Sequence, residues 1–221
     1  MGFSKDFVWG VATSAYQIEG ATSEEGKGAN IWDEYCRQPG KILNGETADV
    51  ACDHYHLYKK DVAIMKEMGV HAYRFSIDWS RVIPEGTGKV NEQGIRFYDN
   101  LVNELLEAGI EPYITLYHWE LPLALERRGG WMNPDIVEWF GDYAALISER
   151  FSDKVTHFFT VNEPQCFVGL GYLRGVHAPG LKRSLSDTLL MAHNVLKAHG
   201  RAVQRLREKA KQPIEIGFAP T

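Results

Sequence analysis

The sequence predicts an α/β fold with parallel strands, amounting to the N-terminal half of a (β/α)8 barrel. Short apolar segments alternate with amphipathic helices along the chain, which is the pattern of parallel α/β folds. The 221 residues hold about four strand–helix units and a fifth strand, whereas a closed barrel needs eight units. No linker or low-complexity tract interrupts the pattern, so we expect residues 1–221 to form a single unit.

The predicted strands are short apolar segments bounded by helices or by turn residues. The first covers about residues 7–12, and the last covers residues 214–219 near the end of the sequence. Between them we predict strands at residues 71–77, 111–117 and 155–161.

Four segments with apolar residues at helical spacing predict the intervening helices. The first helix covers about residues 53–68, and Gly69 is a natural C-terminal stop. The second carries its apolar face over residues 95–106 and stops at Gly109. The third opens at residues 133–135, where Asn, Pro and Asp match an N-cap, a first-turn proline and an acidic first turn.

The fourth predicted helix begins near Ser186. Its apolar stripe consists of Leu189, Ala192, Leu196, Val203 and Leu206. An amphipathic helix buries such a stripe against its domain, so we expect these side chains to face the core.

Composition argues against several classes of partner. The formal net charge of -5 leaves no basic excess, so nucleic acid is not an expected partner. The sequence has no run of about 18 apolar residues, so we expect no membrane span. The start lacks a secretory signal, and the three cysteines match neither a disulfide framework nor a metal site, so we expect a reducing, cytoplasmic setting and no metal.

Polar residues follow the predicted strands at their carboxyl ends, where parallel α/β barrels build their active sites. Gln17 follows the first strand and Arg74 lies on the second. His118 and Trp119 follow the third strand, and Asn162 and Glu163 follow the fourth. We expect these side chains to meet at one rim of the sheet.

Glu163 is the strongest catalytic candidate among them. It comes directly after an apolar strand, so desolvation should favour its protonated form, which a proton donor to a glycosidic oxygen needs. Pro164 biases Glu163 away from the helical region, so we expect extended geometry to persist to this residue. The competing interpretation is a solvated glutamate at the end of a strand.

The other rim residues also allow two interpretations each. Gln17, His118 and Asn162 suit sugar hydroxyls, but each could equally be a turn or rim residue. Trp119 could be a platform for a sugar ring or a core side chain. Arg74 needs an acidic partner, either Glu163 or a carboxylate outside this chain; a structural ion pair is the alternative.

Taken together, the motifs of this chain resemble family 1 of the glycoside hydrolases, the β-glucosidase family, whose fold is the TIM barrel. The resemblance covers the whole chain. The matching segments are residues 7–20 (FVWGVATSAYQIEG), 31–33 (IWD), 53–55 (DHY), 73–81 (YRFSIDWSR), 118–122 (HWELP), 129–131 (GGW), 160–164 (TVNEP) and 178–180 (APG).

The resemblance implies a role for each rim residue. Glu163 would be the acid/base, and Arg74 would orient and ionise the nucleophile. The sugar-binding residues would be Gln17, His118, Trp119 and Asn162, and with less specificity Val168 and Tyr172 would lie toward the leaving group. No cofactor is implied, since the chemistry needs only carboxyl groups and water.

The sequence departs from the family pattern by a large omission. Family members are about twice as long, and their nucleophile is a second glutamate in a Glu-Asn-Gly segment, which is absent here. A retaining mechanism needs two carboxyl groups about 5 Å apart, and this chain offers one.

Two functions therefore remain open, with β-glucosides or related β-glycosides as ligands. The chain is a fragment of a retaining β-glucosidase, completed by a C-terminal half or by a second copy, and inactive when isolated. Alternatively, it is a non-catalytic half-barrel module that self-associates or binds sugar weakly. A third hypothesis is a cellulase-type endo-glycosidase, but the motif at residues 7–20 argues against it.

Overall fold

A five-stranded parallel sheet organises the protein. The computed structural model describes residues 2–220. The strands follow one another in sequence order across the sheet, and every neighbouring pair is parallel. They are β1 (Gly10–Ala12), β2 (Ala72–Ser76), β3 (Glu111–Tyr117), β4 (His157–Asn162) and β5 (Glu215–Ala219). This arrangement confirms the predicted half barrel.

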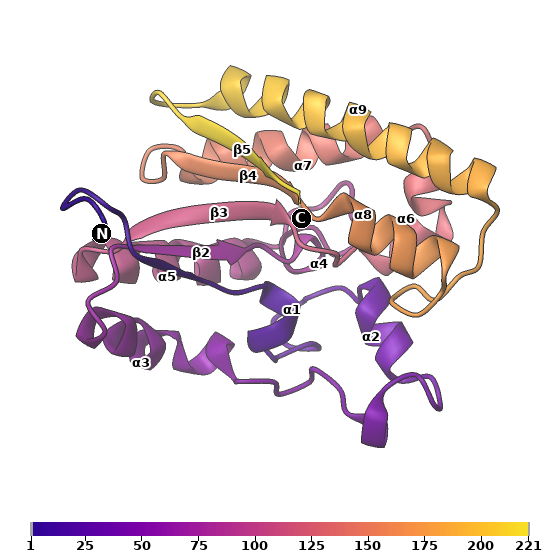
Figure 1. Cartoon of the computed structure of the whole chain (residues 1–221), viewed down its shortest axis with the longest axis horizontal. Helices are drawn as coiled ribbons and strands as arrows, with labels where there is room; N and C mark the ends of the chain where they lie inside the picture. The colour runs from indigo at the N-terminus through magenta and orange to yellow at the C-terminus, as the bar shows by residue number, and fades with distance from the viewer. Residues whose placement is uncertain (1, 221) are drawn as a thin grey trace.

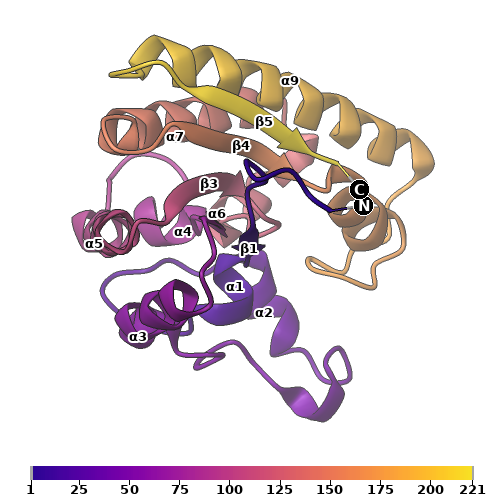
Figure 2. The ribbon, with the colours of Figure 1, turned by 60° about the vertical axis from the view of Figure 1, so that its left-hand side comes forward.

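Long helices cover one side of the curved sheet, as Figure 2 shows. These are α3 (His54–Glu67), α5 (Glu92–Ala108), α7 (Ile136–Phe151) and α9 (Leu185–Lys209). Shorter segments gather beyond the carboxyl ends of the strands (Figure 1): α1 (Ala15–Ile18), α2 (Ile31–Cys36), α4 (Trp79–Val82), α6 (Leu123–Arg127), α8 (Pro164–Cys166) and the π-helix η3 (Phe167–Leu173). Two 3-10 turns, η1 (Leu43–Gly45) and η2 (Gly130–Met132), complete the described elements.

The two faces of the sheet differ in how deeply their side chains are buried. Toward the helices, Phe75, Ile114 and Phe158 are almost fully buried. On the opposite face, Arg74 and Tyr113 are only partly buried and line an open hollow of about 390 Å³. Parallel sheets are normally covered on both faces, so this half barrel exposes what a closed barrel would enclose.

The first strand is shorter than predicted. Residues 7–9 lie outside it, although the carbonyl oxygen of Trp9 still accepts hydrogen bonds from the backbone N–H groups of His71 and Ala72. The rings of Phe3, Phe7 and Trp9 lie 4.4 to 4.7 Å apart, centroid to centroid. Trp9 is nevertheless 50% exposed.

The third long helix begins at Ile136 rather than at residues 133–135. The Asn133 side chain accepts a hydrogen bond from the backbone N–H of Asp135 at 2.9 Å, so it caps the turn that precedes the helix. The fourth begins at Leu185, because the Ser184 side chain is the N-cap that accepts from the Asp187 N–H.

The predicted apolar stripe of α9 is wrong at two of its five positions, because Leu189 and Leu196 are 63% and 58% exposed. Leu206 is fully buried as predicted, and Ala192 packs against the core from a partly buried position. The other buried residues of α9, which packs mainly against α7, are Thr188, Met191, Asn194, Val195, Ala198 and Ala202. The exposed leucines form a second, uncovered apolar stripe.

Within residues 2–220, none of the helices combines the length and the apolarity that crossing a lipid bilayer requires.

Two glycines of long helices provide a matched test of this packing. A Cβ added at Gly94 of α5 would lie 2.2 Å from the backbone oxygen of Arg81, whereas one at Gly200 of α9 would meet nothing within 4 Å. Gly94→Ala should lower the free energy of unfolding by about 1–3 kcal/mol, because backbone must move. Gly200→Ala should raise it by about 0.5–1 kcal/mol, because alanine is the better helix former. Urea unfolding of both variants measures the two changes, and a stabilised Gly94→Ala would contradict the close contact.

Candidate functional site

The predicted rim residues do meet at the carboxyl end of the sheet. Asn162 is the last residue of β4, and its side chain contacts residues of the β2 and β3 units. The Oδ1 atom of Asn162 accepts a hydrogen bond from Nη2 of Arg74 on β2 at 2.6 Å. Its Nδ2 faces Nε2 of His118, beyond β3, at 3.1 Å. Asn162 is 4% exposed, so this bridge is shielded from water.

Trp119 is attached to the same residue through the backbone. Its indole Nε1 donates to the carbonyl oxygen of Asn162 at 3.0 Å. Since the indole nitrogen is thereby satisfied, the ring of Trp119 is held in place while remaining partly exposed.

His118 is held neutral in one tautomer. Because the Asn162 Oδ1 is occupied by Arg74, the Asn162 amide nitrogen points at His118 and donates to Nε2. The proton of the neutral ring therefore sits on Nδ1, a buried atom that has no hydrogen-bond partner among the described residues. Burial and the positive charge of Arg74 lower the pKa of His118 to about 4. The ring is thus uncharged at neutral pH.

Arg74 has no carboxylate within ion-pair distance among residues 2–220. Its Nε donates to Oγ1 of Thr115 at 2.8 Å, and its guanidinium lies 4.8 Å from the centre of the Phe159 ring. Burial lowers the pKa of Arg74, and the negative charge of Glu163 partly opposes this at longer range. Of the two acidic partners considered for Arg74, Glu163 therefore makes no ion pair with it, and Arg74 lines the open hollow.

Glu163 turns the chain instead of extending the strand. Its φ and ψ are 46° and 62°, in the left-handed region, so the expectation of extended geometry is wrong. Its N–H still donates to the carbonyl of Ala219 on β5 at 2.8 Å, after which Pro164 starts α8. The left-handed conformation escapes the right-handed helical region that proline disfavours, and it redirects the chain in a single residue.

Two residues of this rim have a positive φ. Besides Glu163, Trp119 has a φ of 89°, and such values are uncommon for bulky residues. The five other non-glycine residues with a positive φ in the described part of the chain lie between residues 21 and 53. Strained residues persist only where the surroundings fix them, so contacts at the carboxyl end of the sheet hold Glu163 and Trp119 in place. Glu163 itself is half-buried.

Gln17 lies in α1 and is exposed at the edge of a hollow of about 170 Å³. His118, Trp119 and Trp32 also line this hollow. The hollow therefore brings the first and third units of the chain together around one small space.

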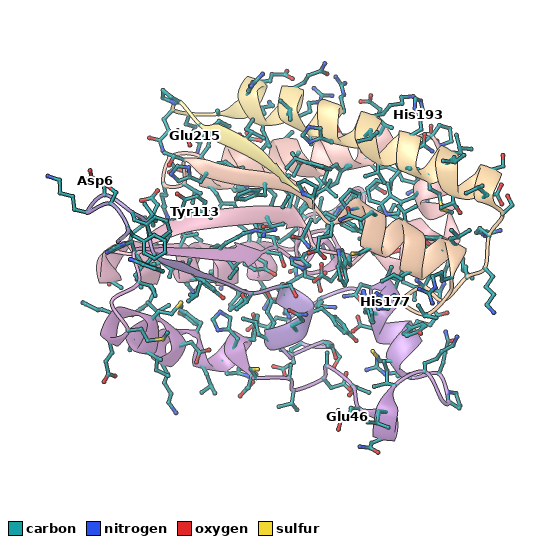
Figure 3. The ribbon with its side chains drawn as sticks, in the orientation of Figure 1. Asp6, Glu46, Tyr113, His177, His193 and Glu215 are labelled. Carbon is teal, nitrogen blue, oxygen red and sulfur yellow. The ribbon has the colours of Figure 1, made fainter. Side chains whose placement is uncertain are left out.

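Sequence reasoning missed two aromatic residues at this rim. The ring of His177 lies 5.6 Å from Trp32 and 5.8 Å from Trp119, centroid to centroid, and Figure 3 shows His177 beyond the carboxyl ends of the strands. Both missed residues are adjacent to or within quoted motifs, Ile31-Trp32-Asp33 and the Ala178-Pro179-Gly180 that follows His177. That adjacency was the available signal.

Val168 and Tyr172 are closed off from solvent. They are 5% and 1% exposed and pack in the hydrophobic core, and the Tyr172 hydroxyl donates to Glu126 at 2.6 Å. Their predicted place toward the leaving group stays a prediction.

The rim offers one half-buried carboxyl group, neutral hydrogen-bonding groups and aromatic surfaces. Among residues 2–220, no cluster of three or more His, Cys, Asp or Glu side chains is arranged to hold a metal ion. Such a set suits a neutral, hydroxyl-rich ligand with an apolar ring face.

Comparison with known proteins gives the family. The model of glycosyl hydrolase family 1 matches residues 1–220. Beta-glucosidase A of Acetivibrio thermocellus is 53% identical over 217 residues, covering 98% of this chain and 48% of the relative. Beta-glucosidase A of Thermotoga maritima is 48% identical, covering 95% of this chain and 47% of the relative.

Solved structures agree. The β-glucosidase from Thermotoga maritima in complex with glucoimidazole superposes with a TM-score of 0.95 at 47% identity, covering 98% of this chain and 49% of that one. The castanospermine complex gives 0.95 at 48% identity, with the same shares. The chain thus spans about half the length of the curated relatives it matches. It belongs to glycosyl hydrolase family 1.

Proposed function

We propose that this chain supplies the acid/base half of a retaining β-glucosidase active site. The observation that carries the proposal is Glu163, a half-buried carboxyl group on a strained residue directly after Asn162, which bridges Arg74 and His118. The relatives are named β-glucosidases, and one of them binds glucoimidazole and castanospermine.

Each rim residue has a part in this chemistry. Gln17, His118, Asn162 and Trp119 hold the sugar, three of them by hydrogen bonds and Trp119 by its ring face. Glu163 protonates the glycosidic oxygen as the leaving group departs, then removes a proton from the water that releases the sugar. A second carboxyl group must attack the anomeric carbon, and it comes from outside this chain.

The exchange of Glu163 for glutamine tests this assignment. In the enzyme reconstituted with a complementary C-terminal half, Glu163→Gln should lower kcat/KM for an alkyl β-glucoside by about 10²–10⁴-fold, because an amide cannot donate the proton. For an aryl β-glucoside with a good leaving group, Glu163→Ala should regain turnover when azide is added, because azide needs no general base. Glu67→Gln, on an exposed glutamate of α3, is the matched control. Undiminished activity in Glu163→Gln would refute the role.

We also propose that the partner is the complementary C-terminal half of the barrel. The chain covers about half the length of its relatives, so a partner of about the same size would supply the rest of the barrel. β1 and β5 are the two edges of the sheet, and unpaired edges favour pairing with further strands. Arg74, without an ion-pair partner among the described residues, borders the open face and suits a carboxylate from that half. Residues 1–221 would then be one unit of a two-part barrel.

The uncovered leucine stripe of α9 should contribute to that association. Leu189→Glu and Leu196→Glu each place a charge where a neighbouring helix would bury an apolar side chain, so the Kd for the C-terminal half should rise by about tenfold or more. Leu43→Glu, on an 82% exposed leucine in η1, should leave the Kd unchanged. Titration calorimetry measures all three. Sedimentation of the chain alone shows whether a second copy occupies the face, in which case the same variants would dissociate a homodimer.

The non-catalytic module is the weaker alternative, because relatives named β-glucosidases match 95% and 98% of this chain. We further propose a cytoplasmic setting, supported by the odd number of cysteines in the sequence.

A further inference from the structure

A buried carboxyl group, Glu120, lies immediately behind the sugar-binding rim. It follows Trp119 in the chain and is 1% exposed. The chemistry proposed above does not use it. An acidic side chain is almost never fully buried without a specific partner, so its contacts require an explanation.

Glu120 caps the helix that carries Gln17. Its Oε1 accepts a hydrogen bond from the backbone N–H of Tyr16 at 3.1 Å. The preceding N–H, of Ala15, donates to the Oγ atom of Ser76 at 2.7 Å. Ser14, the N-cap residue of α1, makes no side-chain capping bond of its own. The first amides of α1 are thus satisfied by side chains from two other units of the barrel.

A helix of four residues cannot hold its shape alone, because nucleation costs more than so few hydrogen bonds return. The position of Gln17 therefore depends on tertiary contacts. Ser76 and Glu120 hold the start of α1, while Arg81 and Tyr98 hold Glu19 at its C-cap. β2 lies between β1 and β3, so the Glu120 bond spans a whole strand of the sheet. It joins the segment of Gln17 directly to the segment of His118 and Trp119.

The surroundings favour a neutral carboxyl group. Burial raises the pKa of Glu120 well above its usual range, and the negative charge of Asp78 raises it further. The Asp78 carboxylate already has its own donors, among them Asn30 Nδ2 at 3.0 Å and Lys27 Nζ at 3.3 Å. A neutral carboxyl group keeps a carbonyl oxygen as acceptor, which the Tyr16 amide requires.

We propose that Glu120 is a positioning residue of the sugar site: its side chain, through the Tyr16 amide, sets the place of Gln17 relative to His118 and Trp119. This proposal rests on the glycosidase function proposed above. It requires an acceptor oxygen at this point and no negative charge.

Two substitutions separate these requirements in the reconstituted two-chain enzyme. Glu120→Gln keeps the acceptor oxygen, so KM for an aryl β-glucoside should stay within about twofold of the unmodified value. Glu120→Met fills similar space with no oxygen, so KM should rise about tenfold, the loss of one hydrogen bond to sugar, with kcat changed less.

A double-mutant cycle with Gln17→Ala then shows whether the effect passes through Gln17. If it does, Glu120→Met should change KM little once Gln17 is already alanine. If the effects of Glu120→Met and Gln17→Ala on KM multiply independently, the proposal is overturned and Glu120 is a purely structural residue. A Glu120→Gln variant with a KM as high as that of Glu120→Met would have the same consequence.

Amide hydrogen exchange of the unmodified 221-residue chain gives a test that needs no activity. The Tyr16 N–H should be protected in this chain, and Glu120→Gln should preserve that protection. Rapid exchange at Tyr16 in the unmodified chain would overturn the proposal even if Glu120→Met failed to fold. A reconstituted enzyme without turnover but with a protected Tyr16 amide would instead count against the glycosidase function alone.

Discussion

A parallel sheet covered on only one face is the constraint on which the rest of this structure depends. The helices α3, α5, α7 and α9 bury one side of the sheet, while the other side, with Arg74 and Tyr113, lines an open hollow. Parallel strands are stable where both faces are covered. The incomplete barrel therefore explains three features: the exposed inner face, the edge strands β1 and β5, and the leucine stripe of α9.

The site at the rim is incomplete for the same reason. Asn162 links three strands by bonding Arg74 and His118 through its side chain and Trp119 through its carbonyl oxygen. This bridge fixes Arg74, His118 and Trp119 relative to one another within this chain alone. It leaves Arg74 as a cation without an ion-pair partner among the described residues, and it leaves Glu163 as a single carboxyl group at the rim. A retaining mechanism needs both a second carboxyl group and something to orient it.

Much of the fold followed from the sequence because strand and helix periods are local signals. The range of β3 is the predicted one, and α5 ends at Gly109 as expected. The errors arose where tertiary contacts decide. Leu189 and Leu196 recur at helical spacing, so periodicity alone assigned them to the core, but both are exposed. Phe7 and Trp9 pack their rings against each other and against Phe3, ahead of the first residue of β1.

The site was predictable in outline for a related reason. Polar residues after parallel strands converge at one rim whatever their exact contacts, so the meeting of Arg74, His118, Asn162 and Glu163 could be foreseen. The left-handed turn at Glu163 could not, since both extended and left-handed geometry satisfy the restriction that Pro164 imposes. Trp32 and His177 lie within or beside quoted motifs, but the contact between their rings at the rim depends on how α2 and the segment before α9 fold together.

We propose that this chain contributes the acid/base and that a different polypeptide contributes the nucleophile. A 2-deoxy-2-fluoro-β-glucoside with a good leaving group traps the covalent glycosyl–enzyme of a retaining glycosidase. After the reconstituted enzyme reacts with it, intact-protein mass spectrometry should find the added fluorosugar on the C-terminal half and none on the 221-residue chain. A fluorosugar attached to this chain, or turnover by this chain alone, would show that the nucleophile does not come from a different polypeptide.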